Sequence, residues 1–375
     1  MNKDFFIKSL KTMSQIRAIE NLFAEHFKKN KNSSFLHLSA GQEASAVGVC
    51  AALKNKDLVF GNHRSHGHYV AKGSNIFKMI YEVLGDTRGC CKGNGGSMHM
   101  LDKKKGFMGT TPILGSAAPI AAGIAMSQKI KKKNFITVVF LGDGAAEEGS
   151  FYETLNIASL YKLPLLIVIE DNNYSVEVPS FLRKAKNYNL KKIVEGFSPY
   201  YKKVNGQDFV KIYSNVKKLK KLILKNNKPG ILHLKVLRTY AHSGFNIDTQ
   251  NKYRQESVKD HKIYDPILIL IGSFGYVVFY LLDYVDGGVA RFNGNSGIGG
   301  QYVDWIMHNI VTIGMTTGIF IGSLHTTGSW IIPFGILCVV SSALTYDKYS
   351  FAWFAVSMYY QQNKSKGKSE EMIEI

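Results

Sequence analysis

Cysteine is scarce in this sequence: four residues among 375, namely Cys50, Cys90, Cys91 and Cys338. Their positions follow neither a metal-binding spacing nor a disulfide framework, which excludes a disulfide-stabilised scaffold and favours a reducing compartment. The N-terminus also lacks an uninterrupted apolar segment, because charged residues recur through the first 23 positions. This pattern predicts an amphipathic helix instead of a signal peptide, so we expect the first part of the chain to stay in the cytoplasm.

Acidic residues are few, with 28 against 47 lysines and arginines, and the formal net charge is +19. Residues 1–262 contain 42 basic and 20 acidic residues, a net charge of +22, whereas the remainder contains 5 and 8, a net charge of −3. Such charge could indicate nucleic acid, an anionic membrane surface or an acidic substrate. No nucleic-acid-binding motif accompanies it, so we expect no nucleic-acid partner and interpret the lysines, as in the run 217–228, as solvated helix faces.

Charged residues are absent from long stretches after residue 266. Residues 267–282 contain none, residues 305–346 form an uncharged stretch of 42 residues, and another such stretch covers residues 349–363. Because about 20 apolar residues cross a bilayer as a helix, this composition predicts a small all-α membrane helix module at 267–363. It would follow a domain at 1–266 and precede a polar tail at 364–375. We therefore expect a membrane-associated protein whose N-terminal domain is cytoplasmic.

Apolar runs alternate with helical segments in the first 266 residues. Residues 135–141 and 165–169 form apolar runs, as buried parallel strands do, and residues 231–237 are expected to form a third strand. Residues 1–30 and 148–162 have helical periodicity. Another helix is expected to begin within residues 39–44. This alternation predicts an α/β fold with a doubly wound parallel sheet, in which ligands bind at the carboxyl ends of the strands.

Polar residues follow two of these strands. Gly142-Asp143-Gly144 comes after the run at 135–141, and Asn172, twenty-nine residues beyond Asp143, comes after the run at 165–169. The Asp143 carboxylate, the Asn172 amide and the Tyr174 carbonyl offer the hard oxygen ligands that Mg²⁺ prefers. Glycines let the backbone approach a phosphate closely, and a helix N-terminus favours its charge. The pattern predicts a magnesium-bound diphosphate site, whereas Gly-Asp-Gly alone would more often be a structural turn.

Several further segments are collinear with one known family. They are residues 35–53 (FLHLSAGQEASAVGVCAAL), 63–73, 93–100, 113–125, 142–174 and 238–254. Together, over residues 10–266, they resemble the α subunit (E1α) of thiamine-diphosphate-dependent 2-oxoacid and acetoin dehydrogenases. The resemblance implies the thiamine diphosphate-binding fold, the cofactors thiamine diphosphate and Mg²⁺, and a small 2-oxoacid substrate. It also implies a β-type E1 subunit as partner, in an α2β2 tetramer, and a lipoyl carrier protein as a candidate acceptor.

The resemblance assigns Mg²⁺ to Asp143, Asn172 and Tyr174. The full set of cofactor-binding residues it implies is Arg64, His63, Ile113, Leu114, Gly115, Gly142, Asp143, Gly144, Asn172, Tyr174 and His242. Arg64 and His242 would contact the diphosphate, and residues 113–115 would line the aminopyrimidine. His63 falls where many relatives have an aromatic residue. No second pyrimidine-type domain is found in the sequence, so the glutamate that faces the aminopyrimidine must come from the partner.

Two histidines are candidate catalytic residues in this half, His242 for proton transfer and His66 as a polar group of the active site. His99 is a further candidate. A buried structural histidine is the alternative for each of them, and for His68. One departure from the family is Asp171, which stands where the first asparagine of a pair is usual. It keeps an oxygen ligand but adds charge near the metal.

A second pattern lies in the C-terminal part. Asp283-x-x-Asp286-Gly287-x-x-Ala290-Arg291, followed by Gly300 and Asp304, places carboxylates at the edge of the predicted membrane helices, where charge is costly and usually functional. Over residues 270–350 the spacing resembles the CDP-alcohol phosphatidyltransferase signature. The resemblance implies a second divalent metal pair and CDP binding. The implied metal ligands are Asp283, Asp286 and Asp304, and the implied CDP-binding residues are Gly287, Ala290, Arg291 and Gly300.

His308 occupies the position of the fourth aspartate of that signature, the general base, and would be the catalytic residue there. This exchange, and the lack of the helix that precedes the motif in the family, argue against active phosphotransfer. The leading hypothesis is therefore an E1α-type subunit with a partial, vestigial membrane module. The alternatives are a bifunctional enzyme or phosphatidyltransferase of phospholipid head-group synthesis, a non-catalytic membrane scaffold, and an artificial fusion joined near residue 266.

Overall fold

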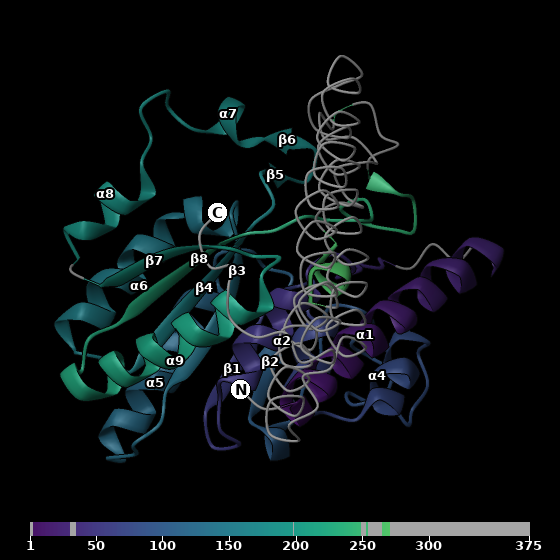
Figure 1. The fold of residues 1–375 in the computed structure, drawn as a ribbon, viewed down its shortest axis with the longest axis horizontal. Helices are drawn as coiled ribbons and strands as arrows, with labels where there is room; N and C mark the ends of the chain where they lie inside the picture. Colours follow the sequence, from purple (N-terminus) through teal and green to yellow (C-terminus); the bar gives the residue numbers. More distant parts are fainter. Residues whose placement is uncertain (1–2, 31–34, 198, 249–252, 254–264, 271–375) are drawn as a thin grey trace, which may run out of the picture. The chain divides into compact units, whose positions relative to one another are not determined.

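The computed structural model describes residues 3–30, 35–197, 199–248, 253 and 265–270 (Figure 1). The chain divides into two units, Met1–Ser273 and Phe274–Ile375, and all described residues lie in the first unit. The predicted polar tail, and the predicted membrane module apart from residues 267–270, lie outside the described residues. Among the helices that are described, none is both long and apolar enough to cross a membrane.

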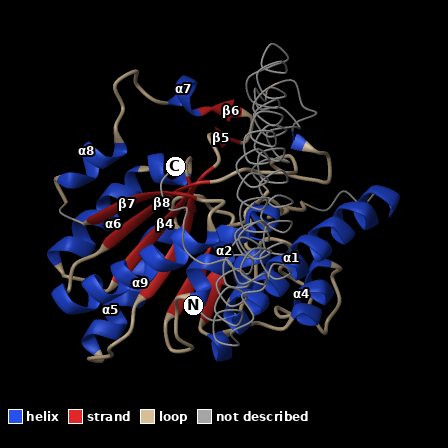
Figure 2. Cartoon of the chain, in the orientation of Figure 1, coloured by secondary structure: helices blue, strands red, loops and turns tan. Residues whose placement is uncertain are grey.

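Six parallel strands form the main sheet, in the order β2-β1-β3-β4-β8-β7 (Figure 2). Their bounds are β1 (Leu58–Gly61), β2 (Phe107–Thr110), β3 (Thr137–Gly142), β4 (Leu165–Asp171), β7 (Tyr200–Asn205) and β8 (Gly230–Lys235). Two short antiparallel strands, β5 (Tyr174–Ser175) and β6 (Val178–Pro179), form a separate pair. The prediction of a parallel α/β sheet is confirmed, and the three predicted strands are its central ones, β3, β4 and β8.

Helices surround this sheet. The α-helices are α1 (Lys3–Asn30), α2 (Glu43–Ala51), α3 (His66–Ala71), α4 (Ile76–Val83), α5 (Ala117–Ile130), α6 (Gly149–Leu160), α7 (Ser180–Arg183), α8 (Leu190–Glu195) and α9 (Phe209–Asn226). Two short 3-10 helices, η1 (Lys103–Lys105) and η2 (Ala145–Glu147), complete the described elements. The predicted helices at 1–30 and 148–162 correspond to α1 and α6, and the one expected to begin within residues 39–44 is α2.

The sheet has a separate apolar core on each face. Along β3, Val138 and Phe140 belong to the core that contains side chains of α1, α2 and α9, whereas Val139 and Leu141 belong to the core of α5 and α6. Successive side chains of a strand point to opposite faces, so a strand covered on both faces must be apolar at every position. This requirement explains the continuous apolar runs that identified the central strands in the sequence.

Helix α9 shows how the lysine-rich run 217–228 is accommodated. It begins after Asp208, whose side chain accepts a hydrogen bond from the Lys211 N–H at 2.9 Å, and it buries Leu219 and Ile223. These positions recur every three to four residues, so one stripe faces the core. The other lysines of the run lie away from this stripe, but Lys220 pairs with the buried carboxylate of Asp57. The interpretation of this run as a solvated helix face is therefore correct, except that Leu222 of the expected stripe is 38% exposed.

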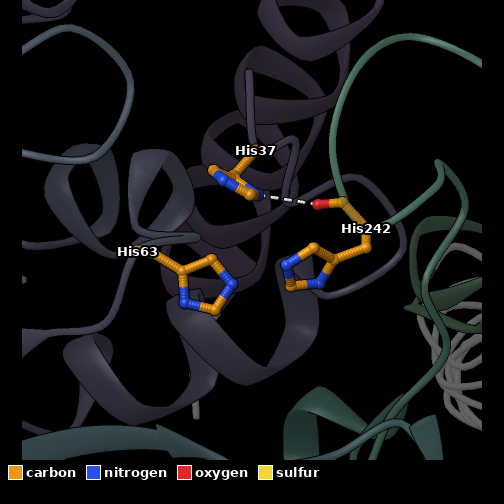
Figure 3. A group of neighbouring side chains, drawn as sticks. All are labelled: His37, His63 and His242. Carbon is orange, nitrogen blue, oxygen red and sulfur yellow. Dashed lines mark hydrogen bonds between the residues drawn. The ribbon is translucent and has the colours of Figure 1, made fainter. Parts of the chain in front are cut away.

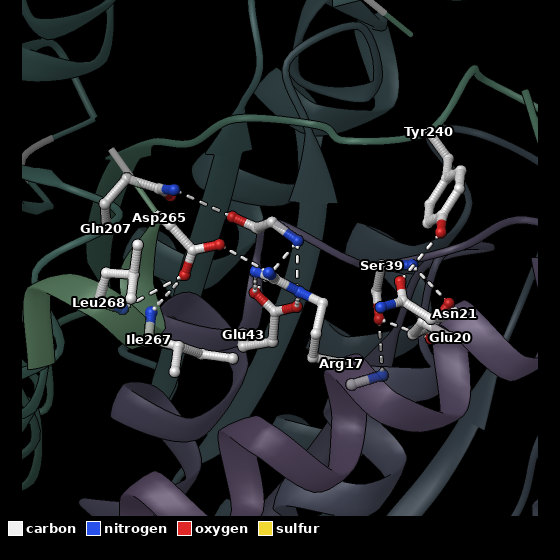
Figure 4. Close-up of polar contacts among 12 residues, drawn as sticks. Arg17, Glu20, Asn21, Ser39, Glu43, Gln207, Tyr240, Asp265, Ile267 and Leu268 are labelled. Carbon is white, nitrogen blue, oxygen red and sulfur yellow. Dashed lines mark hydrogen bonds and ion pairs between the residues drawn. The ribbon is translucent and has the colours of Figure 1, made fainter. Parts of the chain in front are cut away.

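An ion-pair cluster ties the N-terminal helix to the end of the described chain (Figure 4). Arg17 of α1 donates to both carboxylate oxygens of Glu43 on α2, at 2.5 and 2.9 Å, and to Asp265 at 2.6 Å. Glu43 is fully buried and also accepts two hydrogen bonds from the Gly41 N–H. The cluster fixes the segment at 41–43, which leads directly to the cavity described below.

Candidate functional site

A cavity opens at the carboxyl ends of β1, β3 and β4, and it encloses about 460 Å³ with its open mouth included. Its walls come from six separate segments of the chain. The lining residues are Gln42, Asn62, His63, Arg64, Leu114, Gly142, Asp143, Gly144, Ala145, Glu170, Asn172, Tyr174, Ser175, Val176, Arg238 and His242. The sheet topology thus brings together the polar residues that follow β3 and β4 in the sequence.

Asp143 follows β3 directly and is 3% exposed. Its Oδ2 accepts a hydrogen bond from Nη2 of Arg183, on α7, at 2.6 Å, and Arg183 also pairs with Glu147. Burial raises the pKa of Asp143 and the charge of Asp171 adds to this, while Arg183 acts in the opposite direction. The carboxylate is therefore held beside a positive charge that a metal ion would have to replace.

Asn172 and Tyr174 lie in the tight turn that leaves β4. The Asn172 Oδ1 accepts a hydrogen bond from the Tyr174 N–H at 3.2 Å, and Asn173 has a positive φ of 72°. Tyr174 begins β5 and is buried. Asn172 and Tyr174 line the same cavity as Asp143, so the three residues predicted to supply oxygen ligands share one site.

Asp171 does not line the cavity in the way the sequence suggested. Its Oδ2 accepts a hydrogen bond from Nε2 of His233 at 3.0 Å, and Lys235 contacts its Oδ1 at 3.4 Å. Burial would raise the pKa of Asp171, but the hydrogen bond from His233 and the charge of Lys235 outweigh burial and lower it. The extra carboxylate is thus ionised and engaged with β8.

Two buried arginines supply positive charge to the cavity. Arg64, after β1, donates to the carbonyl of Leu38 at 2.6 Å and to the carbonyl of His242 at 2.8 Å. Burial, together with the charge of Arg238, lowers the pKa of Arg64 to about 9. Arg238 is 1% exposed and pairs with Asp248 at 3.0 Å. Arg238 is a cavity residue that the sequence analysis did not single out, although it opens the block at 238–254.

Three histidine rings gather beside these arginines (Figure 3). The ring centroids of His37, His63 and His242 lie 4.8 to 5.3 Å from one another. Burial and the charge of Arg64 lower their pKa values to about 4, about 2 and about 3 respectively, so all three rings are neutral at pH 7. Within the described residues, neither ring nitrogen of His63 has a hydrogen-bond partner, although both are buried.

The other candidate histidines lie away from the cavity. His66 is fully buried, with Nδ1 2.9 Å from Glu20 and Nε2 3.0 Å from Ser97. His68 stacks on Phe140 and its Nε2 contacts Glu170 at 3.1 Å. His99 is exposed. The geometry therefore gives His66 and His68 structural surroundings, the alternative considered for each.

The segment at 113–115 lies at the mouth of the cavity. Leu114 lines it and is 41% exposed, while Ile113 is 70% exposed. Gly115 has a φ of 86°, a conformation that side chains other than glycine rarely adopt, and its carbonyl accepts a hydrogen bond from Ser150 at 3.0 Å. Of the three predicted aminopyrimidine contacts, only Leu114 reaches the cavity wall in this chain.

The C-terminal site residues lie outside the described residues. These are Asp283, Asp286, Gly287, Ala290, Arg291, Gly300, Asp304 and His308. A metal pair, CDP binding and phosphotransfer at these positions therefore stay predictions from the sequence.

Comparison with known proteins bears on the first 272 residues. A family model described as the dehydrogenase E1 component matches residues 11–272. The α subunit of an acetoin:2,6-dichlorophenolindophenol oxidoreductase from Bacillus subtilis is 34% identical over 257 residues, which is 66% of this chain and 74% of that protein. The pyruvate dehydrogenase E1 component subunit α of Rickettsia bellii is 35% identical over 266 residues, or 71% and 80% of the two chains.

Among solved structures, a transketolase from Campylobacter jejuni aligns with 63% of this chain and 38% of its own, with a TM-score of 0.47 and 22% identity. The family match ends at residue 272, before the pattern that begins at Asp283. For the region before it, the resemblance stated from the sequence is confirmed. This chain belongs to the dehydrogenase E1 component family.

Proposed function

We propose that this chain is the α-type subunit of a thiamine-diphosphate-dependent 2-oxoacid or acetoin dehydrogenase, and that the cavity holds the cofactor diphosphate together with Mg²⁺. The observation that supports this most directly is the convergence of two kinds of group in one cavity. Asp143, Asn172 and Tyr174, which offer oxygen ligands, line the same cavity as the guanidinium-bearing Arg64 and Arg238. A metal-bound anion needs both kinds of group.

The donor set suits this ligand. A carboxylate, an amide oxygen and a backbone carbonyl are ligands that Mg²⁺ takes in near-octahedral geometry, with phosphate oxygens completing the shell. The arginines would oppose the phosphate charge, and the one N–H of the neutral, unpartnered His63 ring would be able to donate to a phosphate oxygen. A Cβ at Gly144 would come within 2.7 Å of Ser175 Oγ, so the chain is tightly packed where the backbone passes the cavity.

When bound, thiamine diphosphate supplies the electron sink for cleavage of the bond next to a carbonyl carbon. The residues of this chain would bind, orient and desolvate it. Asp143 would exchange Arg183 for the metal ion, and Arg64 would keep its two backbone hydrogen bonds while facing the diphosphate. The His242 ring is neutral at pH 7, because its pKa is lowered to about 3, so it would offer one N–H donor and one acceptor nitrogen to groups bound in the cavity.

A partner subunit is part of the proposal. The β-type subunit would supply the carboxylate that faces the aminopyrimidine, and it would cover the mouth of the cavity. The exposure of Ile113 and Leu114 at that mouth supports this, because large apolar side chains at a site entrance are usually covered in the assembly. We propose an α2β2 assembly, with a lipoyl carrier as a candidate acceptor. Membrane association through residues 267–363, with the N-terminal domain in the cytoplasm, remains a separate prediction.

The test is magnesium-dependent thiamine diphosphate binding by the purified full chain, measured by titration calorimetry. Asp143→Ala should abolish the magnesium dependence, whereas Glu153→Ala, at an exposed position on α6, should leave it unchanged. Adding a β-type subunit should then give turnover of pyruvate or of acetoin, read as reduction of a dye acceptor. Binding that ignores the Asp143 substitution, or a full chain that binds no cofactor with or without the partner, would refute the proposal.

A further inference from the structure

The three-histidine cluster has a geometry that the proposed cofactor site does not require. The nitrogen atoms of His37, His63 and His242 that are able to bind a metal ion all lie within 4.8 Å of one another. They come from three distant segments, before α2, after β1 and after β8, so this proximity is a product of the fold. In a tetrahedral zinc site the ligand nitrogens are about 3.3 Å apart. Small side-chain rotations would close the remaining gap.

One ring is already oriented as metal-binding histidines usually are. Nδ1 of His37 donates a hydrogen bond to the carbonyl of His242 at 2.7 Å (Figure 3). This bond fixes the proton on Nδ1 and leaves a lone pair on Nε2, which is the second-shell arrangement typical of zinc-binding histidines. His63 supplies the second, independent observation, because its two buried nitrogens have no hydrogen-bond partner within the described part of the chain.

Charge acts against a cation here. Arg64 donates to the His242 carbonyl at 2.8 Å, and Arg238 is near enough to lower the pKa of all three histidines. Arg238 is compensated by Asp248, but Arg64 makes its side-chain hydrogen bonds to carbonyl groups. A metal ion in this cluster would therefore be favoured with an anion as fourth ligand, in the open position that a three-histidine site leaves.

We propose that His37, His63 and His242 bind one zinc-like divalent transition metal ion in the cofactor-free cavity, and that this ion and the cofactor diphosphate exclude one another. The first part stands on the geometry of the cluster alone. The second part rests on the proposed function, because it requires the diphosphate to occupy the space between Arg64 and His242. In that case the bound ion would lower the apparent affinity of the apoprotein for thiamine diphosphate.

Co²⁺ is the probe for the site, because four-coordinate Co²⁺ gives intense visible absorption whereas octahedral Co²⁺ does not. The purified full chain, free of cofactor, is titrated with Co²⁺ and then with Zn²⁺ in competition. The critical variant is His63→Gln, which breaks no hydrogen bond of the described structure. His99→Gln, at an exposed histidine, is the matched control.

The expected result is one four-coordinate Co²⁺ per wild-type chain, displaced by Zn²⁺, with at least a tenfold weaker affinity in His63→Gln and an unchanged affinity in His99→Gln. An unchanged affinity in His63→Gln would overturn the site. So would a thiolate charge-transfer band, which would place the ion at the second group of candidate ligands, Glu82, Cys90 and Cys91. In that group Glu82 already accepts hydrogen bonds from three backbone N–H groups.

Thiamine diphosphate with Mg²⁺ is then added to the Co²⁺-loaded chain. Release of Co²⁺ in proportion to cofactor bound supports mutual exclusion. Retention of Co²⁺ by a chain that demonstrably binds the cofactor overturns it. A chain that binds Co²⁺ as expected but never binds thiamine diphosphate would instead refute the proposed function, and leave the metal site in place.

Discussion

Acidification should destabilise this domain through its three neutral histidines. Their pKa values in the folded chain are about 4 for His37, about 2 for His63 and about 3 for His242, against an ordinary value of about 6.5 in the unfolded chain. Because the folded-state values are depressed, the full stability is present above pH 6.5. Below that pH the unfolded chain takes up protons that the folded chain does not, and stability is lost until the folded-state values are reached.

The magnitude follows from linkage. Each proton bound only by the unfolded chain costs about 1.4 kcal/mol per pH unit. Between pH 7 and pH 5.5 each histidine therefore lowers the free energy of unfolding by about 1.2 kcal/mol, and the three together lower it by about 4 kcal/mol. For a domain with a total stability of about 5–15 kcal/mol, this is a large fraction. The stated range stays above the pH at which most carboxylates titrate.

The assay is denaturant unfolding at pH 7.0, 6.5, 6.0 and 5.5, with a chelator present so that no metal ion occupies the cluster. His63→Gln removes one of the three titrating groups, so its loss between pH 7 and pH 5.5 should be smaller than that of the wild type by about 1 kcal/mol. His99→Gln should show the wild-type loss. Equal losses in the wild type and in His63→Gln, or a wild type as stable at pH 5.5 as at pH 7, would refute the reasoning.

Three further predictions concern packing and charge. Gly48→Ala should lower the free energy of unfolding by about 1–3 kcal/mol, because the added methyl group would lie 2.8 Å from a side chain of α9. The control, Gly123→Ala, has open space beside it and should leave the free energy of unfolding unchanged or raise it in the same assay. Glu82→Gln should cost about 2–3 kcal/mol, since its carboxylate accepts three backbone hydrogen bonds, while Glu153→Gln at an exposed position should change stability little. Arg183→Gln should lower the free energy of unfolding of the magnesium-free protein by about 1–3 kcal/mol, because it leaves the buried Asp143 unpaired. Mg²⁺ should then raise the melting temperature of this variant more than that of the wild type. An equal rise in both proteins would contradict the pairing.

The central strands were predictable because burial on two faces leaves a strong signal. The strands β3 and β4 are apolar at nearly every position, and β8 buries every residue except Lys235. The prediction placed all three within a few residues of their observed bounds. The strands β1 and β2 are only four residues long, and the edge strand β7 carries two consecutive exposed lysines, Lys202 and Lys203. A short or half-exposed strand needs no continuous apolar run, so the sequence gives no comparable signal for it.

The residues of the cavity and the histidine cluster also divide into those that the sequence could predict and those that it could not. Asp143 and Asn172 follow predicted strands, and parallel topology alone brings the ends of neighbouring strands together. His37 reaches the histidine cluster, and Arg238 the cavity, from segments whose position depends on tertiary packing. The segment of His37 is held by Ser97, whose Oγ accepts a hydrogen bond from the His37 N–H at 3.0 Å, and Arg238 is held by Asp248. No local pattern around either residue reports these distant contacts, so spacing in the sequence could not identify them.

Asp171 shows how an added charge next to the proposed metal site can be accommodated by the sheet. In the register of β4 and β8 it lies opposite Lys235, whose charge compensates it across the strands. His233 donates from Nε2 to Asp171, and its Nδ1 lies 2.7 Å from the hydroxyl group of Tyr201 on β7. These contacts form a chain of hydrogen bonds across three strands. Burial and the charge of Asp171 raise the pKa of Tyr201 to about 12, which keeps its hydroxyl proton in place. The second carboxylate is therefore directed into β8 and β7, and Asp143 is left as the aspartate that lines the cavity.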